Sequence, residues 1–189
     1  METLEIKGAG VMSIIQYVQT IHGPAGYTKW LEALSPEACE LISGSVFASS
    51  WYDGYHAVFE LREKVCDVFF DGDPQSARAI GYFAADHGLT GIYKTLVKIG
   101  SVEWVTSRAP LVASRYFRPI TIKPLRKEKN YFLVRMEGVC TKSEPLEASL
   151  CGFNQRAIEI SGGKAVSVTC PSSVAHGDPH IDFECVWKD

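Results

Sequence analysis

The residues that could do chemistry in this sequence are its cysteines, its histidines and a run of carboxylates. The six cysteines are Cys39, Cys66, Cys140, Cys151, Cys170 and Cys185. They form no Cys-x-x-Cys pair, and none stands beside an activating base, so neither a redox motif nor a nucleophilic thiol is indicated. The start of the chain, METLEIKGAG, does not have the pattern of an export signal, and we therefore expect six reduced thiols.

The carboxylates recur along one predicted helix, at Glu60, Glu63, Asp67 and Asp71. Paired carboxylates can serve acid–base catalysis, but Arg62 and Lys64 are interleaved with these, which is typical of a solvated helix face. The sequence also has no Gly-x-Ser-x-Gly elbow, HExxH motif or P-loop. Gly8-Ala9-Gly10 lacks the third glycine and the βαβ frame of a dinucleotide fingerprint. We therefore expect a protein that is not an enzyme.

Composition narrows the class of protein. The chain has 189 residues, of which 46% are hydrophobic and 22% charged, as in an ordinary globular domain. We expect one domain over residues 1–189. The net charge of −3 leaves no surplus of positive charge for nucleic acid. No apolar run approaches the ~20 residues that span a bilayer, so we expect no membrane span and a cytoplasmic location.

Residues 1–118 have a helical pattern. Val58, Leu61, Val65 and Phe69 share one face of a predicted helix over residues 55–70. Ser35-Pro36-Glu37 and Asp73-Pro74 are typical of helix starts, with a capping side chain followed by proline. Gly23-Pro24 predicts a helix end. Pro110 should kink or divide the helix predicted over residues 101–117.

Residues 119–189 change to an alternating pattern. Apolar and polar residues alternate over 120–123, 132–136, 166–170 and 181–187, and a helical pattern over 145–160 separates the two pairs of strands. Short connections within each pair predict hairpins and hence an antiparallel sheet. The sequence therefore predicts an α+β fold, in which an N-terminal helical bundle packs on a C-terminal four-stranded antiparallel sheet of ββαββ order.

Three segments carry a resemblance to known families. The opening, with Lys7-Gly8, Gly23 and residues 30–34 (WLEAL), resembles the start of heme-nitric-oxide-binding (H-NOX) domains. The end, residues 170–187, resembles the closing hairpin of 4-vinyl-reductase-type domains. These families form a ligand-binding superfamily with the TRAPP subunits. The middle, residues 49–52 (SSWY) and 91–93 (GIY), is similar to uncharacterised bacterial proteins of a group expanded in myxobacteria.

The resemblance implies a pocket between the helices and the concave face of the sheet. H-NOX domains hold heme there, with a proximal histidine on the helix before the sheet and a Tyr-x-Ser-x-Arg clamp for the propionates. Here that helix has no histidine, and residues 114–118 (SRYFR) do not fit the clamp. The histidines lie in other segments, at His22, His56, His87, His176 and His180. We therefore predict no heme and no other cofactor.

Zinc is the alternative that the resemblance leaves open. Some 4-vinyl-reductase-type sensors bind zinc near the last hairpin, and the matching residues here are Cys170 and His180, with Cys151 and His176 as helpers. Strand parity opposes the site, because Cys170 shares a face with Val168 whereas His180 should point the other way. A loop before His180 could still reorient it.

An apolar ligand pocket remains. Its candidate lining residues are the aromatic side chains Phe47, Trp51, Tyr55, Phe59, Phe83, Tyr93 and Trp104. We predict a sensory or regulatory module that binds a small hydrophobic ligand without heme. The alternative is a protein-interaction scaffold in which the same residues fill the core, and a cavity larger than ~300 Å³ would argue against it. The resemblance to TRAPP subunits also implies a homodimer.

Overall fold

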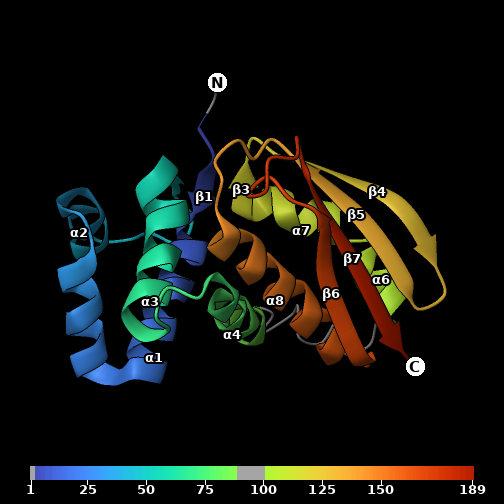
Figure 1. Cartoon of the computed structure of the whole chain (residues 1–189), viewed down its shortest axis with the longest axis horizontal. Coiled ribbons are helices and arrows are strands. Elements are labelled where there is room, and N and C mark those ends of the chain that lie inside the picture. Colours follow the sequence, from blue (N-terminus) through green and yellow to red (C-terminus); the bar gives the residue numbers. More distant parts are fainter. Residues whose placement is uncertain (1–2, 89–100) are drawn as a thin grey trace.

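A four-stranded antiparallel sheet forms one side of the molecule (Figure 1). The computed structural model describes residues 3–88 and 101–189. In spatial order the strands are β4 (Thr121–Glu128), β5 (Tyr131–Glu137), β7 (Ile181–Lys188) and β6 (Lys164–Ser172). Alternate residues of β5 point to one face, and there Phe132, Val134 and Met136 are buried.

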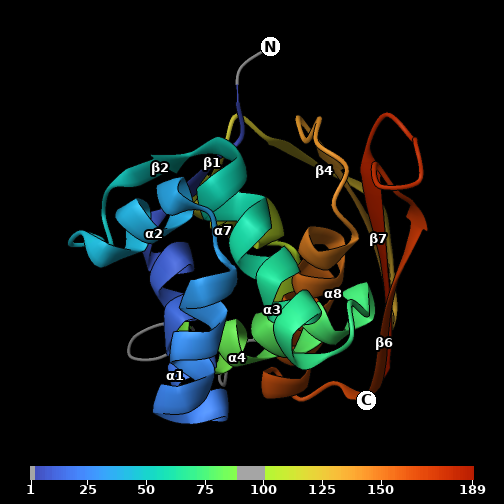
Figure 2. The ribbon, with the colours of Figure 1, turned by 60° about the vertical axis from the view of Figure 1, so that its left-hand side comes forward.

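Helix α8 (Glu144–Ile160) connects β5 to β6 and covers the apolar face of the sheet (Figure 2). Its first turn is capped by Ser143, whose hydroxyl accepts a hydrogen bond from the Leu146 amide at 3.3 Å. Hairpins join β4 to β5 and β6 to β7. The predicted ββαββ order and the α+β fold are confirmed.

Most of the remaining helices form a layer on the other side of α8 (Figure 2). They are α1 (Gly8–Ala33), α2 (Pro36–Ser43), α3 (Leu61–Phe69) with a preceding π-helical turn η1 (His56–Glu60), and α4 (Arg78–Gly88) with a preceding 3₁₀ turn η2 (Pro74–Ala77). The last two helices, α6 (Val102–Thr106) and α7 (Ala109–Tyr116), lie along the sheet, where α6 contacts α8 and α7 packs against β4 (Figure 1).

Several predicted helix boundaries are confirmed. The Ser35 hydroxyl accepts a hydrogen bond from Ala38, and the Asp73 carboxylate accepts one from Gln75. Pro110 lies in the first turn of α7, so the helix predicted over 101–117 is divided into α6 and α7. Gly23 breaks the helical geometry of α1, with a φ of 67° and a ψ of −174°, so the helix end predicted at Gly23-Pro24 is confirmed. A second helical segment follows this break and continues to Ala33.

A second sheet of three short strands was not predicted. Strand β1 (Glu5–Lys7) pairs with β2 (Trp51–Asp53) on one side and with β3 (Phe117–Arg118) on the other. Strands of two or three residues are too short to show an alternating pattern, so the sequence carries no signal for them. This sheet joins the start of α1 to the end of α7.

Helices α4 and α8 cross in close contact at two glycines. A Cβ on Gly81 would lie 1.7 Å from the Ser149 carbonyl oxygen, and one on Gly152 would lie 2.1 Å from the Arg78 carbonyl oxygen. The two backbones therefore touch where neither helix has a side chain. In the part of the chain that the structure describes, no helix combines the length and the apolar character needed to cross a bilayer.

Candidate functional site

A cavity of about 590 Å³, which we call the main pocket, lies between helices α6, α7 and α8 and the inner face of the sheet. Trp104 and Thr106 of α6, Val112 and Tyr116 of α7, and Phe153 and Ile158 of α8 form its helical walls. The sheet contributes Phe132, Val134 and Cys185, and cations are present at Lys7, Arg108 and Arg115. Its volume is within the range of cofactor and small-molecule sites.

The sequence places these walls through two local patterns. In β5, period-two alternation turns Phe132 and Val134 inward, while Arg135 points outward to an ion pair with Asp182 at 2.8 Å. In α8, Phe153 and Ala157 lie four residues apart on the face toward the sheet. Because Pro110 lies in the first turn of a new helix, α6 and α7 are separate helices, and each forms its own part of the pocket wall.

A second cavity of about 330 Å³, the side pocket, adjoins the main pocket. The two cavities share wall residues, among them Val112, Tyr116, Val134, Phe153 and Asn154. The side pocket extends into the helical layer, where its walls are Met12, Ser13 and Gln16 of α1, Arg62 of α3, and Ile80, Ala84 and His87 of α4.

Arg62 is the charged group in the wall of the side pocket. Its side chain is 5% exposed, although the interleaved charges of this helix predicted a solvated face. Burial lowers the pKa of the Arg62 guanidinium to about 10, so it remains a cation at neutral pH. Sequence reasoning missed this residue, because a single arginine facing inward does not disturb the pattern of charges around it.

Glu60, on the same segment, is also buried and not solvated. Its carboxylate accepts hydrogen bonds from the Ser35 amide at 2.6 Å and the Ser35 hydroxyl at 2.9 Å, and it contacts Nδ1 of His56 at 2.5 Å. Burial by itself would raise the pKa of Glu60, but these hydrogen bonds lower it overall. Glu60 therefore fixes η1 to the start of α2.

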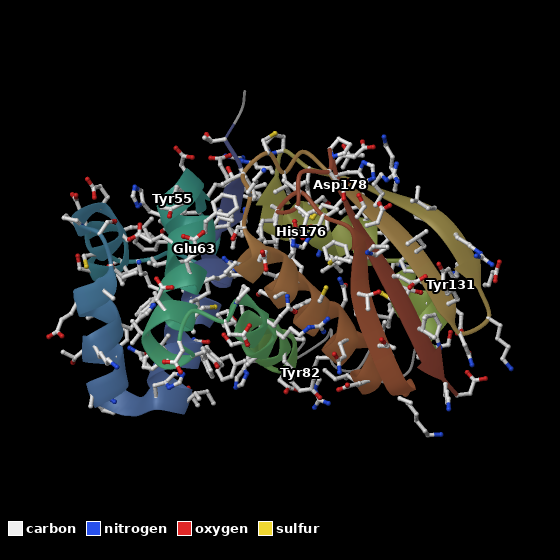
Figure 3. All side chains as sticks on the ribbon, in the orientation of Figure 1. Tyr55, Glu63, Tyr82, Tyr131, His176 and Asp178 are labelled. Carbon is white, nitrogen blue, oxygen red and sulfur yellow. The ribbon has the colours of Figure 1, made fainter. Side chains whose placement is uncertain are left out.

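Of the predicted pocket residues, Trp104 lines the main pocket. Phe59 and Phe83 are core residues packed within the helical layer, and Trp51 lies on β2 between the cations of Lys7 and Arg118. Phe47 and Tyr55 are exposed, and Figure 3 shows Tyr55 beside Glu63, with which it forms a hydrogen bond of 2.8 Å. Tyr93 lies outside the described residues. The structure therefore does not bring this set together.

The predicted zinc ligands are divided between two places. Cys151 of α8 and Cys170 of β6 approach each other, with their Sγ atoms 3.2 Å apart. His176 lies in the loop before β7 (Figure 3), 3.6 Å from Glu144, and His180 lies 3.6 Å from Asp182. Within residues 3–88 and 101–189, no three His, Cys, Asp or Glu side chains are grouped to hold a metal ion.

Comparison with known proteins identifies the fold. No protein-family model and no curated protein matches the sequence. An H-NOX protein from S. oneidensis, solved in the Fe(II)NO state, has a TM-score of 0.74 and 14% identity over 97% of this chain and 100% of its own. An unliganded Fe(II) H-NOX protein from K. algicida has a TM-score of 0.72 and 10% identity over 97% of each chain. An oxygen-binding H-NOX domain related to soluble guanylate cyclases has a TM-score of 0.64 and 10% identity, over 97% of this chain and 96% of its own. The chain has the H-NOX fold.

These neighbours contradict the prediction that the chain has no cofactor. Proteins of this fold were solved with Fe(II) and Fe(II)NO, so the fold accommodates an iron centre. The prediction was wrong because it required the axial histidine on the helix before the sheet and set aside the histidines of other segments, whereas a pocket has several walls from which an axial ligand can come.

The walls can be tested for their fit to a heme. The main pocket is large and mostly apolar, as a porphyrin requires, and Lys7, Arg108 and Arg115 could face its carboxylates. The histidine in the described walls is His87 of α4, which lines the side pocket. Its Nδ1 lies 2.9 Å from the Phe83 carbonyl oxygen, which can accept a hydrogen bond from that nitrogen. Among the described residues, the histidine that lines either pocket is therefore on α4, and it lines the side pocket and not the main pocket.

Proposed function

We propose that residues 1–189 act as one sensory domain, without catalytic activity of its own, that binds a small ligand in the main pocket. The observation that carries this proposal is the cavity of about 590 Å³ enclosed between the helices and the sheet. Its walls are apolar with few polar groups, which is the usual composition of a ligand site. A filled core, on which the scaffold alternative depends, would leave no such space.

The H-NOX fold supports a ligand-responsive role, because the solved neighbours carry iron with nitric oxide or oxygen. Heme is therefore the first ligand to test. When bound, a heme would supply an iron atom to which a diatomic gas can bind. This chain would supply the apolar walls that exclude water, the cations near the carboxylates, and His87 as axial ligand.

The first experiment is titration of the purified full chain with hemin, followed by reduction and addition of nitric oxide. We expect a saturable Soret band that shifts when nitric oxide is added. His87→Ala should weaken binding and change the spectrum, whereas His176→Ala, in an exposed loop, should leave both unchanged. An unchanged spectrum in His87→Ala would remove His87 from the proposed ligand role.

The second experiment tests the pocket itself with Nile red, an uncharged dye that fluoresces in apolar surroundings. Val112→Trp places a bulky side chain where the main and side pockets meet, and it should abolish dye and hemin binding. Leu125→Trp is the control, because Leu125 is 44% exposed on β4. Binding of neither compound to the unmodified chain, or equal binding to Val112→Trp, would refute the proposal.

Because we propose no catalytic activity for the domain itself, its output needs a partner or a change of oligomeric state. The homodimer implied by the sequence resemblance stays a prediction. Light scattering of the purified chain with and without a bound ligand would check it.

A further inference from the structure

The side pocket contains a buried cation with an incomplete set of partners. The Arg62 guanidinium donates one hydrogen bond, from Nη1 to the Val58 carbonyl of its own helical segment. Its Nε is buried and has no hydrogen-bond partner. Among the described residues, no carboxylate forms an ion pair with it.

Burial of an unpaired cation lowers the stability of the folded protein. A buried charge normally has a counter-ion, because desolvation of an unpaired ion costs several kcal/mol. Arg62 is 5% exposed, and an apolar side chain of similar length would fill the same volume without that cost. A buried arginine that faces a cavity is therefore suited to a counter-ion that comes from outside the chain.

A second buried polar group in the same cavity also lacks a partner. The Ser13 hydroxyl, on α1, lines the side pocket, and its Oγ forms no hydrogen bond. A hydroxyl donates one hydrogen bond, and a guanidinium donates up to five in a planar fork. Together these donors suit a carboxylate, which is planar and accepts two parallel hydrogen bonds from arginine.

The other walls of the side pocket indicate the chemical character of the rest of the ligand. Ile14, Ile80 and Phe183 make the side pocket apolar, and the walls shared with the main pocket, such as Val112 and Phe153, continue that apolar surface. One cation can neutralise one negative charge, which favours a monoanion over a phosphate monoester with nearly two charges. Resting on the proposed ligand-binding function, we infer that the two pockets bind a hydrophobic monocarboxylate, with its carboxylate at Arg62 and Ser13 and its apolar body toward the main pocket.

The inference is tested by calorimetric titration of the full chain with three ligands of equal length: octanoate, 1-octanol and octylamine. We expect octanoate to bind about 10- to 100-fold more tightly than 1-octanol, because a charge-assisted hydrogen bond contributes more than a neutral one. Octylamine should bind most weakly. Arg62→Met should reduce the preference for octanoate to less than about threefold, and Ser13→Ala should reduce it by a smaller factor. Arg126→Met is the control, since Arg126 is 57% exposed and paired with Glu128.

A structural role of Arg62 is separated from ligand recognition by the melting temperature without ligand. Removal of an unpaired buried charge should leave that temperature equal or higher in Arg62→Met, whereas loss of a structural arginine would lower it. Arg62→Lys, which keeps the charge but loses the fork, is a second variant and should show an intermediate preference.

The outcomes distinguish this inference from the proposed function. Equal affinity of the unmodified chain for octanoate and 1-octanol would overturn the inference and leave the pocket as a binding site. A preference for octanoate that persists in both Arg62 variants would also overturn it. Binding of none of the three ligands, together with no binding of Nile red, would refute the proposed function as well.

Discussion

Replacement of Gly81 by alanine tests the close crossing of α4 and α8, on which the side pocket depends. The added Cβ would lie 1.7 Å from the Ser149 carbonyl oxygen and 2.8 Å from the Phe153 amide nitrogen, whereas ordinary contacts begin near 3.4 Å. Both neighbours are backbone atoms of α8, so no side chain can rotate away. The helices must therefore separate by more than an ångström.

The magnitude follows from two opposing effects. Overpacking of a dense interior costs about 1–3 kcal/mol, and a clash with rigid backbone belongs at the upper end. Alanine regains up to about 1 kcal/mol of helix propensity over glycine. We expect the free energy of unfolding to fall by about 2 kcal/mol, which lowers the urea midpoint by about 1 M for a typical denaturant slope.

The assay is urea unfolding followed by far-ultraviolet circular dichroism. Gly44→Ala is the matched control, because a Cβ there would meet its nearest atom at 3.5 Å and the residue has a φ of −68°. That control should be neutral or slightly stabilising. A midpoint for Gly81→Ala equal to or above that of the unmodified chain would refute the claim that the two backbones touch.

Three further predictions concern buried polar groups. Diamide should take two electrons and two protons from Cys151 and Cys170, whose Sγ atoms are 3.2 Å apart, and peptide mapping should find that disulfide; its absence would contradict the geometry. Glu60→Gln should lower the free energy of unfolding by about 1–3 kcal/mol at neutral pH. The folded-state pKa of Glu60 is lowered, so this deficit should shrink as the pH falls through that pKa, and a deficit independent of pH would refute the assignment. Glu147→Ala should cost about 3 kcal/mol in thermal unfolding, since Ser173 and Ala175 lose their acceptor, whereas Glu144→Ala should cost little.

Much of the fold could be predicted from local patterns. The alternation at Phe132, Val134 and Met136 identified an inward strand face, and the capping residues Ser35 and Asp73 marked helix starts. The neighbour order within the sheet could not be predicted, because pairing of β5 with β7 depends on contacts far apart in the sequence.

The candidate site was less predictable, for a physical reason. Aromatic residues are equally suited to a core and to a pocket wall, and of the predicted residues that the structure describes, only Trp104 lines the main pocket. The walls of the main pocket come from several helices and three strands, so their convergence is a property of packing and not of any one segment. Arg62 and Ser13 carry no motif, and their significance depends on which direction each side chain faces.

The sheet of three short strands has a practical consequence for anyone who engineers the chain. β1 is the middle strand of its sheet, and its Ile6 is 1% exposed, with Tyr52 opposite it on one neighbour and Phe117 on the other. Trimming the first seven residues would therefore remove the hydrogen-bonding partner of both flanking strands, and any shortened version of the chain should keep them.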